Sequence, residues 1–262
     1  MEAKESKNFL KPIYFVLNEA GEITYFSLRF FRLIFKRPFE FSEFVRQCYY
    51  IGNKSLPLVA VTALIMGLVI TIQSRPTLVE FGAEAWLPKM VSVSLVREIV
   101  PVITALICAG KIGSGIGAEL GSMKVTEQID AMEVSGTNPF KFLVVTRVLG
   151  TTLMIPVLTV LADAISLYGA YLGTNIRGVV SWNLFWNQVF DVLVYADIIP
   201  SLLKTFFFGF AIGIVGCYKG YNSQKGTEGV GISANSSVVI SSLLVFVLDL
   251  IAVQITDLLG FT

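Results

Sequence analysis

Five apolar stretches, each about 20 residues long, constrain this chain more than any other feature. They lie near residues 56–74, 90–110, 148–173, 198–218 and 238–259. An α-helix of that length crosses the hydrocarbon core of a bilayer. The chain is 54% hydrophobic and 15% charged, which is too little charge to cover the surface of a soluble protein of 262 residues. We therefore predict an all-α integral membrane protein whose five transmembrane helices form a single domain, residues 1–262.

The basic residues indicate how these spans are oriented. Of the 20 Lys and Arg residues, nine precede the first span, four lie between the second and third spans, and two follow the fourth span. Cytoplasmic loops of membrane proteins carry an excess of Lys and Arg. We therefore expect a cytoplasmic N-terminus and, because the number of spans is odd, a C-terminus on the outer, periplasmic side.

Residues 1–54 precede the first span and contain an amphipathic pattern. Apolar residues recur there at helical spacing, opposite a basic face. The apolar positions are Ile23, Phe26, Phe30, Leu33 and Ile34, and the basic positions are Arg29, Arg32, Lys36 and Arg37. The pattern predicts an interfacial elbow helix in the inner membrane surface. A soluble helix folded onto the cytoplasmic loops is the alternative.

The loop between the second and third spans contains a second amphipathic segment. Val125, Ile129 and Met132 share one helical face, and acidic residues follow one another at three-residue steps on another. The run Ser135-Gly136-Thr137-Asn138-Pro139 ends the segment, because Gly permits a left-handed cap and Pro cannot continue a helix. We predict a short cytoplasmic helix over residues 119–134. The alternative is an ordinary solvated loop helix.

Charged residues inside the predicted spans are candidates for function. Arg97 and Glu98 lie roughly 10 Å into the second span, where a charge costs about 2.5–3.5 kcal/mol on insertion scales. Arg97 is therefore a candidate to attract a lipid phosphate in a pocket that Glu98 shapes; the alternative is an ion pair with another span, such as with Lys204. Asp163 and Asp249 are expected to satisfy polar groups between helices, and a proton relay is the alternative.

Other catalytic and metal-binding chemistry finds little support. The chain has no histidine, and Cys48, Cys108 and Cys217 are too far apart for a metal-binding motif, so no metal site is predicted. Gly110-Lys111 lacks the remaining residues of a phosphate-binding P-loop. We expect a chain that is not an enzyme and has no cofactor of its own.

Four short motifs follow one another between Leu95 and Arg147. They read R-E-x-x-P-V, A-G-K-x-G-S, A-E-L-G-x-M and T-E-Q-I-D-A-M-E, and N-P and an arginine follow them. In these motifs, and over nearly its whole length, the chain resembles the MlaE-type permease family of bacterial lipid-transporting ABC systems.

The resemblance implies a permease subunit that homodimerises in the bacterial inner membrane around a lipid cavity. A separate cytoplasmic ABC ATPase would bind ATP with Mg²⁺, and a periplasmic MCE-domain protein would bind lipid on the outer side. Such systems move phospholipids between the inner and outer membranes and maintain the lipid asymmetry of the outer membrane. The short cytoplasmic helix would dock into the ATPase through Glu119, Lys124, Glu127, Gln128, Asp130 and Glu133.

The resemblance also implies the residues that border the lipid cavity. They are Arg97, Glu98, Ile70, Gln73, Leu78 and Phe81. The first alternative is a secondary transporter of an amphipathic substrate, driven by protons through Glu98, Asp163 and Asp249. A membrane enzyme acting on lipid is the second, but no clustered nucleophile or metal set supports it.

Overall fold

The computed structural model describes residues 2–37, 39–176 and 178–260, and it confirms the all-α membrane fold. Five helices are long enough and apolar enough to cross a membrane, and they coincide with the five predicted stretches. These spans are Phe41–Glu80, Glu84–Val125, Phe140–Ile176, Tyr195–Tyr221 and Thr227–Leu258.

Two of the spans are assembled from shorter pieces. The second contains α3 (Leu87–Ser94), α4 (Val100–Cys108) and α5 (Ser114–Val125), joined by π-helical turns at Leu95–Ile99 and Ala109–Gly113. The third begins with a π-helical turn and continues as α7. The other spans are single helices, α2, α9 and α10. Their bounds are Thr146–Ile176 for α7, Phe41–Glu80 for α2, Tyr195–Tyr221 for α9 and Thr227–Leu258 for α10.

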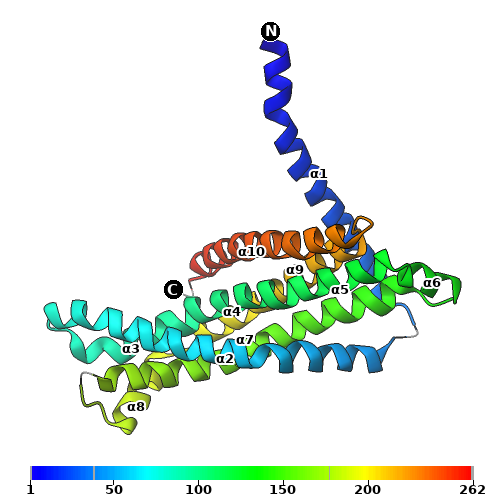
Figure 1. The fold of residues 1–262 in the computed structure, drawn as a ribbon. Coiled ribbons are helices and arrows are strands. Elements are labelled where there is room, and N and C mark those ends of the chain that lie inside the picture. Colours follow the sequence, from blue (N-terminus) through cyan, green and yellow to red (C-terminus); the bar gives the residue numbers. More distant parts are fainter. Residues whose placement is uncertain (1, 38, 177, 261–262) are drawn as a thin grey trace.

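The spans run side by side, with α6 (Gln128–Val134) at one end and α8 (Trp182–Val192) at the other (Figure 1). We call these the α6 end and the α8 end. Helix α1 (Glu2–Ile34) leaves the bundle near the α6 end and runs across the direction of the spans (Figure 1). Its predicted apolar face includes Phe26 and Phe30, which are buried against the bundle.

Helix α7 packs between α2 and α9, and small residues bring α2 and α7 together. A Cβ atom added at Gly67 would lie 1.9 Å from the carbonyl oxygen of Ser166, and one at Gly169 would lie 2.4 Å from that of Leu64. Only glycine permits this approach on each side. The contact extends to the first turns of α2, which explains why this helix begins at Phe41, well before the predicted span at 56–74.

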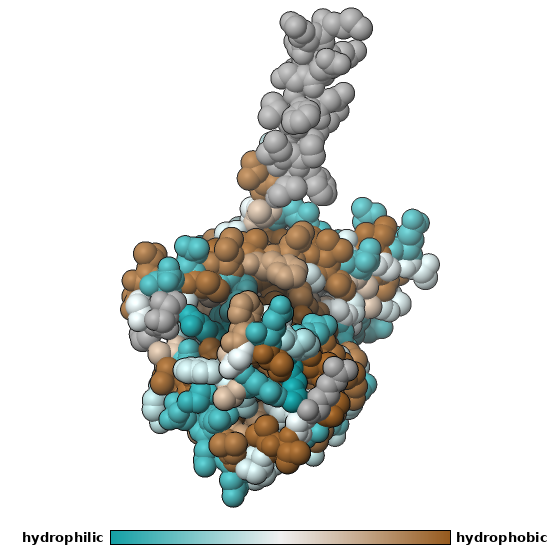
Figure 2. Space-filling model, turned by 90° about the vertical axis from the view of Figure 1, so that its left-hand side faces the viewer, coloured by the Kyte–Doolittle hydropathy of each residue, from teal (hydrophilic) through white to brown (hydrophobic). Residues whose placement is uncertain are grey.

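Helix α10 packs on α5 and α9 through a stripe of small residues. Ser233, Ser237 and Ser241 are buried at four-residue spacing, and Gly117 of α5 faces them closely. The opposite side of α10 exposes large apolar residues, including Leu243 and Phe246, and only 11% of the most apolar stretch of this helix is buried. Figure 2 views the molecule from the α8 end. Hydrophobic residues form a band at the level of α10, and hydrophobic and hydrophilic residues are mixed below it.

Candidate functional site

A buried lysine, Lys204, lies at the centre of a charged cluster inside the bundle. We call Lys204, Glu98 and Asp249 the Lys204 cluster. Lys204 Nζ is 2.6 Å from Glu98 Oε2 and 2.9 Å from Asp249 Oδ1, and the Lys204 side chain is only 5% exposed. The three residues come from the second span, α9 and α10. Lys204 and Asp249 each lie nine residues from the α8 end of their helices, and Glu98 lies eleven residues after the start of α3, which is about 14–17 Å at 1.5 Å per residue. A charge at this depth needs partners, and here three helices supply them.

A π-helical turn in the second span carries Arg97 and Glu98. Residues Leu95–Ile99 form a π-helical turn, a wider turn that often occurs at functional sites. The turn is tied to α9 by Ser201, whose Oγ donates to the Val96 carbonyl oxygen at 2.7 Å. Arg97 extends toward α9, with Nη1 3.8 Å from Asp197 Oδ1, and its side chain remains 36% exposed. Arg97 is therefore less completely neutralised than Lys204.

The charged side chains line an open cavity of about 330 Å³ between the second span, α9 and α10. Arg97, Glu98, Asp197 and Lys204 supply its charges. A second cavity of about 480 Å³ adjoins it and shares five lining residues with it. The remaining lining residues of the second cavity are Tyr195, Ile199, Leu203, Phe207, Ile255 and Leu259. Together the two cavities offer a charged end beside an apolar groove.

The structure places the predicted residues of α2 away from this charged cavity. Ile70 and Leu78 are half-buried and pack against the core of their own chain, whereas Gln73 is exposed. Phe81 is 78% exposed at the end of α2. None of the four is among the residues that line either cavity. A single chain thus brings Arg97 and Glu98 together with α9 and α10, and not with α2.

The two deep aspartates have different surroundings. Asp249 accepts from Lys204, as described above. Asp163 lies on α7, outside the Lys204 cluster, and its buried Oδ1 has no hydrogen-bond partner among the described residues.

The predicted cytoplasmic helix 119–134 is interrupted, and the prediction of one continuous helix is wrong. Helix α5 ends at Val125 and α6 begins at Gln128, because Glu127 adopts a left-handed backbone conformation with φ 57°. The predicted stop is confirmed, since Gly136 has φ +80° directly after the helix. The break lets α6 turn relative to α5, and the Lys124–Asp130 ion pair, at 2.8 Å, joins them.

The predicted coupling residues fall into three groups. Lys124 and Asp130 form the ion pair between α5 and α6. Glu127, Gln128 and Glu133 are exposed on or beside α6, whose Ile129 is buried against the rest of the protein. Glu119 lies on α5, before the break, and takes part in a different contact described below. The acidic surface of α6 is thus free to meet another molecule, while Glu119 already has a partner within the chain.

Comparisons with known proteins identify the family of this fold and site. The family described as "Permease MlaE" matches residues 44–255. The chain belongs to the MlaE permease family. It is 34% identical over 217 residues to a Haemophilus influenzae protein named "Intermembrane phospholipid transport system permease protein MlaE", with 82% of this chain and 83% of that protein covered.

Two further relatives carry a broader name. A "Probable ABC transporter permease protein" of Rickettsia bellii is 37% identical over 227 residues, covering 87% of this chain and 88% of the relative. A Synechocystis protein, "Probable ABC transporter permease protein slr1045", is 36% identical over 203 residues, covering 78% and 77%. The chain is thus a multi-pass membrane protein similar to ABC transporter permeases over most of its length.

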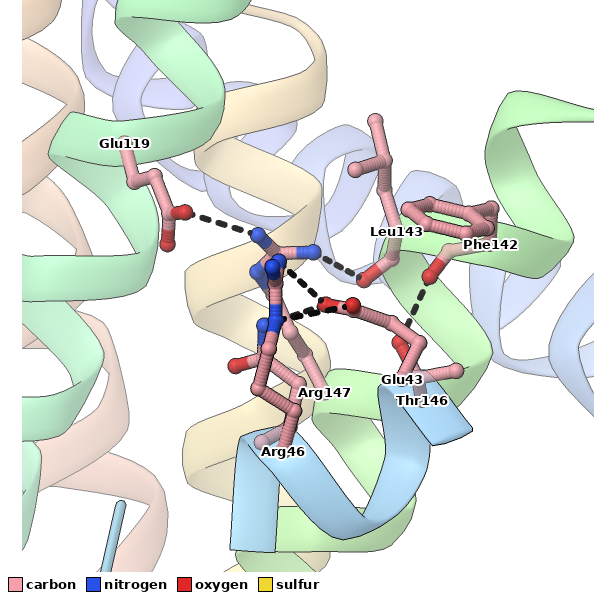
Figure 3. A network of polar contacts seen from close by, with 8 residues as sticks. Glu43, Arg46, Glu119, Phe142, Leu143, Thr146 and Arg147 are labelled. Carbon is pink, nitrogen blue, oxygen red and sulfur yellow. Dashed lines mark hydrogen bonds and ion pairs between the residues drawn. The ribbon is translucent and has the colours of Figure 1, made fainter. Parts of the chain in front are cut away.

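This MlaE-family chain contains a second buried cation, which the sequence analysis left without a role. Arg147, at the start of α7, is 2% exposed, and its Nη2 is 2.9 Å from Glu119 Oε1 on α5. Its Nη1 donates to the Leu143 carbonyl oxygen at 3.0 Å. Figure 3 shows Arg147 reaching between α5 and α7, with Glu43 and Arg46 of α2 close beside it. The signal in the sequence was an arginine at the boundary of an apolar span, a position where charge needs a partner.

The first turns of α2 complete this second cluster. Glu43 is 7% exposed, accepts from Gln47 at 2.7 Å and pairs with Arg46 at 2.9 Å (Figure 3). We call Glu43, Arg46, Gln47, Glu119 and Arg147 the Arg147 cluster. The Arg147–Glu119 pair joins α5 to α7, and Gln47 of α2 lines one cavity together with Glu119, at the base of the segment that carries α6.

Proposed function

We propose that this chain is the permease subunit of an ABC transporter that moves phospholipids between the inner and outer membranes and thereby maintains the lipid asymmetry of the outer membrane. One observation carries the proposal: a charged cavity that contains Arg97 and Lys204 adjoins an apolar groove between α9 and α10. A ligand that fits both parts has a charged head and apolar tails. The phospholipid named for the Haemophilus relative has that composition.

The energetics of acyl chains support an apolar route. Each methylene exposed to water costs about 0.8 kcal/mol, so a lipid with roughly thirty methylenes faces on the order of 24 kcal/mol. Leu203, Phe207 and Ile255 in the groove offer such chains an apolar wall. An ion or a small polar solute would gain nothing from this wall.

Arg97 is the group proposed to contact the phosphate. Lys204 is paired with two carboxylates at 2.6 and 2.9 Å, whereas Arg97 has one carboxylate at 3.8 Å and a side chain that is 36% exposed. A guanidinium offers five donors, and its planar fork matches phosphate oxygens. Glu98 then positions Lys204 and shapes the pocket.

The functional unit is proposed to be a homodimer. Helices α2 and α10 have large apolar surfaces that their own chain does not cover, with 28% and 11% of their most apolar stretches buried. In the dimer, residues Ile70, Gln73, Leu78 and Phe81 of one copy complete the wall of the lipid cavity. This explains why they lie apart from Arg97 within one chain.

The partners follow from the same proposal. A separate ABC ATPase, which binds ATP and Mg²⁺, docks on the exposed acidic surface of α6, and a periplasmic MCE-domain protein receives or delivers lipid at the α8 end. The chain resides in the bacterial inner membrane with its N-terminus and α6 in the cytoplasm and its C-terminus in the periplasm. Coupling runs through α6, whose break at Glu127 lets it move as a unit.

The test is lipid retention and transport by the purified complex. Arg97→Gln is expected to lower the phospholipid that co-purifies roughly tenfold, since a hydrogen bond to a charged group contributes about 1.5–3 kcal/mol. Lys89→Gln is the control, because Lys89 pairs with Asp191 outside both cavities. Equal lipid in both variants would count against the proposed cavity. Lipid transfer driven by a pH gradient without any ATPase would instead favour the proton-driven transporter.

A further inference from the structure

A third cavity lies far from the Lys204 cluster, between α1 and the α6 end of α9. Its volume is about 490 Å³, and four of the side chains that line it are aromatic: Tyr25, Phe26, Tyr218 and Tyr221. Glu22 and Arg29 of α1 also line it and supply one negative and one positive charge. A cavity with aromatic sides and two opposite charges is suited to a small zwitterion.

The two charges lie on one face of α1 at a spacing that a lipid headgroup can bridge. Glu22 and Arg29 are seven residues apart, which is two turns or about 10.5 Å along the helix axis. Both side chains are exposed toward the cavity, and no hydrogen bond or ion pair joins them. The space between them can therefore hold a ligand that is cationic at one end and anionic at the other.

Both charged groups are held in position by neighbours. Glu22 accepts from Asn18 Nδ2 at 3.0 Å and from the Tyr218 hydroxyl, which leaves acceptor sites of its carboxylate unused. The guanidinium carbon of Arg29 lies 4.3 Å from the centre of the Phe140 ring. Among the described residues, no acceptor takes a hydrogen bond from Arg29, so its donors are available to an anion.

The position of the cavity points to the membrane as the source of its ligand. Helix α1 runs across the direction of the spans (Figure 1), and next to the cavity it exposes Leu17, Leu28 and Phe31. Large apolar side chains beside a charged cavity suit the boundary between headgroups and acyl chains. A free phosphate or amine from solution would make no use of this exposed apolar surface.

We infer that this cavity binds the headgroup of an amine-bearing phospholipid, of the phosphoethanolamine type, from the leaflet at the α6 end. Arg29 binds the phosphate, and Glu22 together with the aromatic side chains binds the ammonium group, which is attracted to carboxylates and to aromatic faces. The site is separate from the transport cavity. Phe140, which Arg29 contacts, begins the span that follows α6, and Tyr221 ends α9. The bound lipid therefore connects α1 to these two elements at the α6 end of the bundle.

The experiment uses the full chain in dodecyl maltoside micelles with a trace of phosphatidylethanolamine that carries a photoactivatable diazirine near its glycerol. After illumination, mass spectrometry maps the labelled peptides. We expect labelling of residues 17–29 and 218–222. Unlabelled phosphatidylethanolamine should compete better than phosphatidylglycerol, which lacks the amine, and diacylglycerol, which lacks the headgroup, should not compete.

Variants identify the two charges. Arg29→Gln should lower this labelling roughly tenfold or more, since a hydrogen bond to a charged group contributes about 1.5–3 kcal/mol. Glu22→Gln should keep the labelling but remove the preference for the amine-bearing lipid. Arg32→Gln, an exposed arginine of the same helix that does not line the cavity, is the matched control.

Several results would overturn the inference. They are an absence of labelling at residues 17–29 and 218–222 in the wild-type chain, competition by diacylglycerol equal to that by phosphatidylethanolamine, or equal labelling of Arg29→Gln and Arg32→Gln. The competition uses only the wild-type chain and decides the matter even if a variant fails to fold. Arg97→Gln should leave this labelling unchanged, so failure of the transport cavity and failure of this site are distinguishable.

Discussion

The Lys204 and Arg147 clusters both place one buried cation among helices, but their cations differ in access. Lys204 itself lines a cavity, whereas the cavity of about 320 Å³ beside the Arg147 cluster is lined by Gln47 and Glu119 and not by Arg147. Lys204 is shared by two carboxylates, and Glu98 is 41% exposed to the cavity that Arg97 also lines. Arg147 is 2% exposed and contacts Glu119 of α5 and the Leu143 carbonyl oxygen (Figure 3). The comparison teaches that buried charge in this bundle has two uses. One cluster presents charge to a ligand, and the other joins helix ends.

Removing the carboxylate partner of Arg147 should have the largest effect on stability. Glu119→Ala leaves a fully buried guanidinium without its counter-charge, and such a loss costs about 3–5 kcal/mol. The measurement is the midpoint of thermal unfolding in detergent, with size-exclusion chromatography as the readout of the folded fraction. An unchanged midpoint would show that the Arg147 cluster does not hold the helices together.

Removing Arg147 instead of Glu119 should lower the stability less. This asymmetry is the sharpest test of the Arg147 cluster. Arg147→Met removes the buried charge and leaves Glu119, which is 49% exposed and can be hydrated. We expect its midpoint to lie between those of the wild type and Glu119→Ala. The opposite order would contradict the assignment of Arg147 as the enclosed partner.

In the Lys204 cluster, Lys204→Met should affect lipid binding more than stability. It leaves Glu98 and Asp249 without their counter-charge, which costs up to about 3–5 kcal/mol where the remaining charge is fully buried, but Glu98 is 41% exposed and can be solvated through the cavity. Co-purified phospholipid should fall by more than in Glu119→Ala when equal amounts of folded protein are compared. Equal lipid content in the two variants would remove the distinction between the clusters.

Reversing a charge on α6 should leave both clusters intact and affect only coupling. Glu133→Lys changes an exposed residue, and such surface changes usually alter stability by less than about 0.5 kcal/mol. Stimulation of the partner ATPase by the permease should be lost. Glu80→Lys is the control, because Glu80 is exposed at the last residue of α2, at the α8 end of the bundle. Retained stimulation in Glu133→Lys would exclude the acidic surface of α6 from the docking site.

The smallest effect is expected for an ion pair in water at the α8 end. Lys89 Nζ is 2.7 Å from Asp191 Oδ2, and the Asp191 side chain is 69% exposed. An exposed pair of this kind adds little, because water and salt screen it. Asp191→Asn should leave the unfolding midpoint and the bound lipid unchanged. A clear loss of either would mean that burial is not what separates the clusters from other ion pairs.

The membrane fold was predictable because length and apolar composition decide which segments can span a bilayer. The helical spacing of apolar residues also indicated a helix before the first span, and Gly136 and Pro139 marked the end of α6. The break at Glu127 was not predictable, because Glu is not a residue that favours a left-handed backbone and nothing in the local pattern marks it. The beginning of α2 at Phe41 depends on packing against α7, which no single segment reveals.

The sites were predictable in part. A charge inside an apolar span signals a functional or paired group, so Arg97, Glu98 and Asp249 could be singled out and Lys204 considered as a partner. Which groups meet is a property of helix packing, and the simultaneous contact of Lys204 with Glu98 and Asp249 required the three-dimensional arrangement. Arg147 was noted only as the last residue of the family motifs, because its burial and its pairing with Glu119 depend on how α5 and α7 pack. The cavity beside Arg29 could not be found, since its walls come from segments almost 200 residues apart.

The most direct test of the central claim is a cryo-electron microscopy map of the purified complex in a phospholipid bilayer nanodisc. Our account predicts density for a two-chain lipid, with its phosphate beside Arg97 and its acyl chains along Leu203, Phe207 and Ile255. A complex whose Arg97 cavity contains only solvent, with the groove between α9 and α10 filled by side chains of a partner, would contradict it.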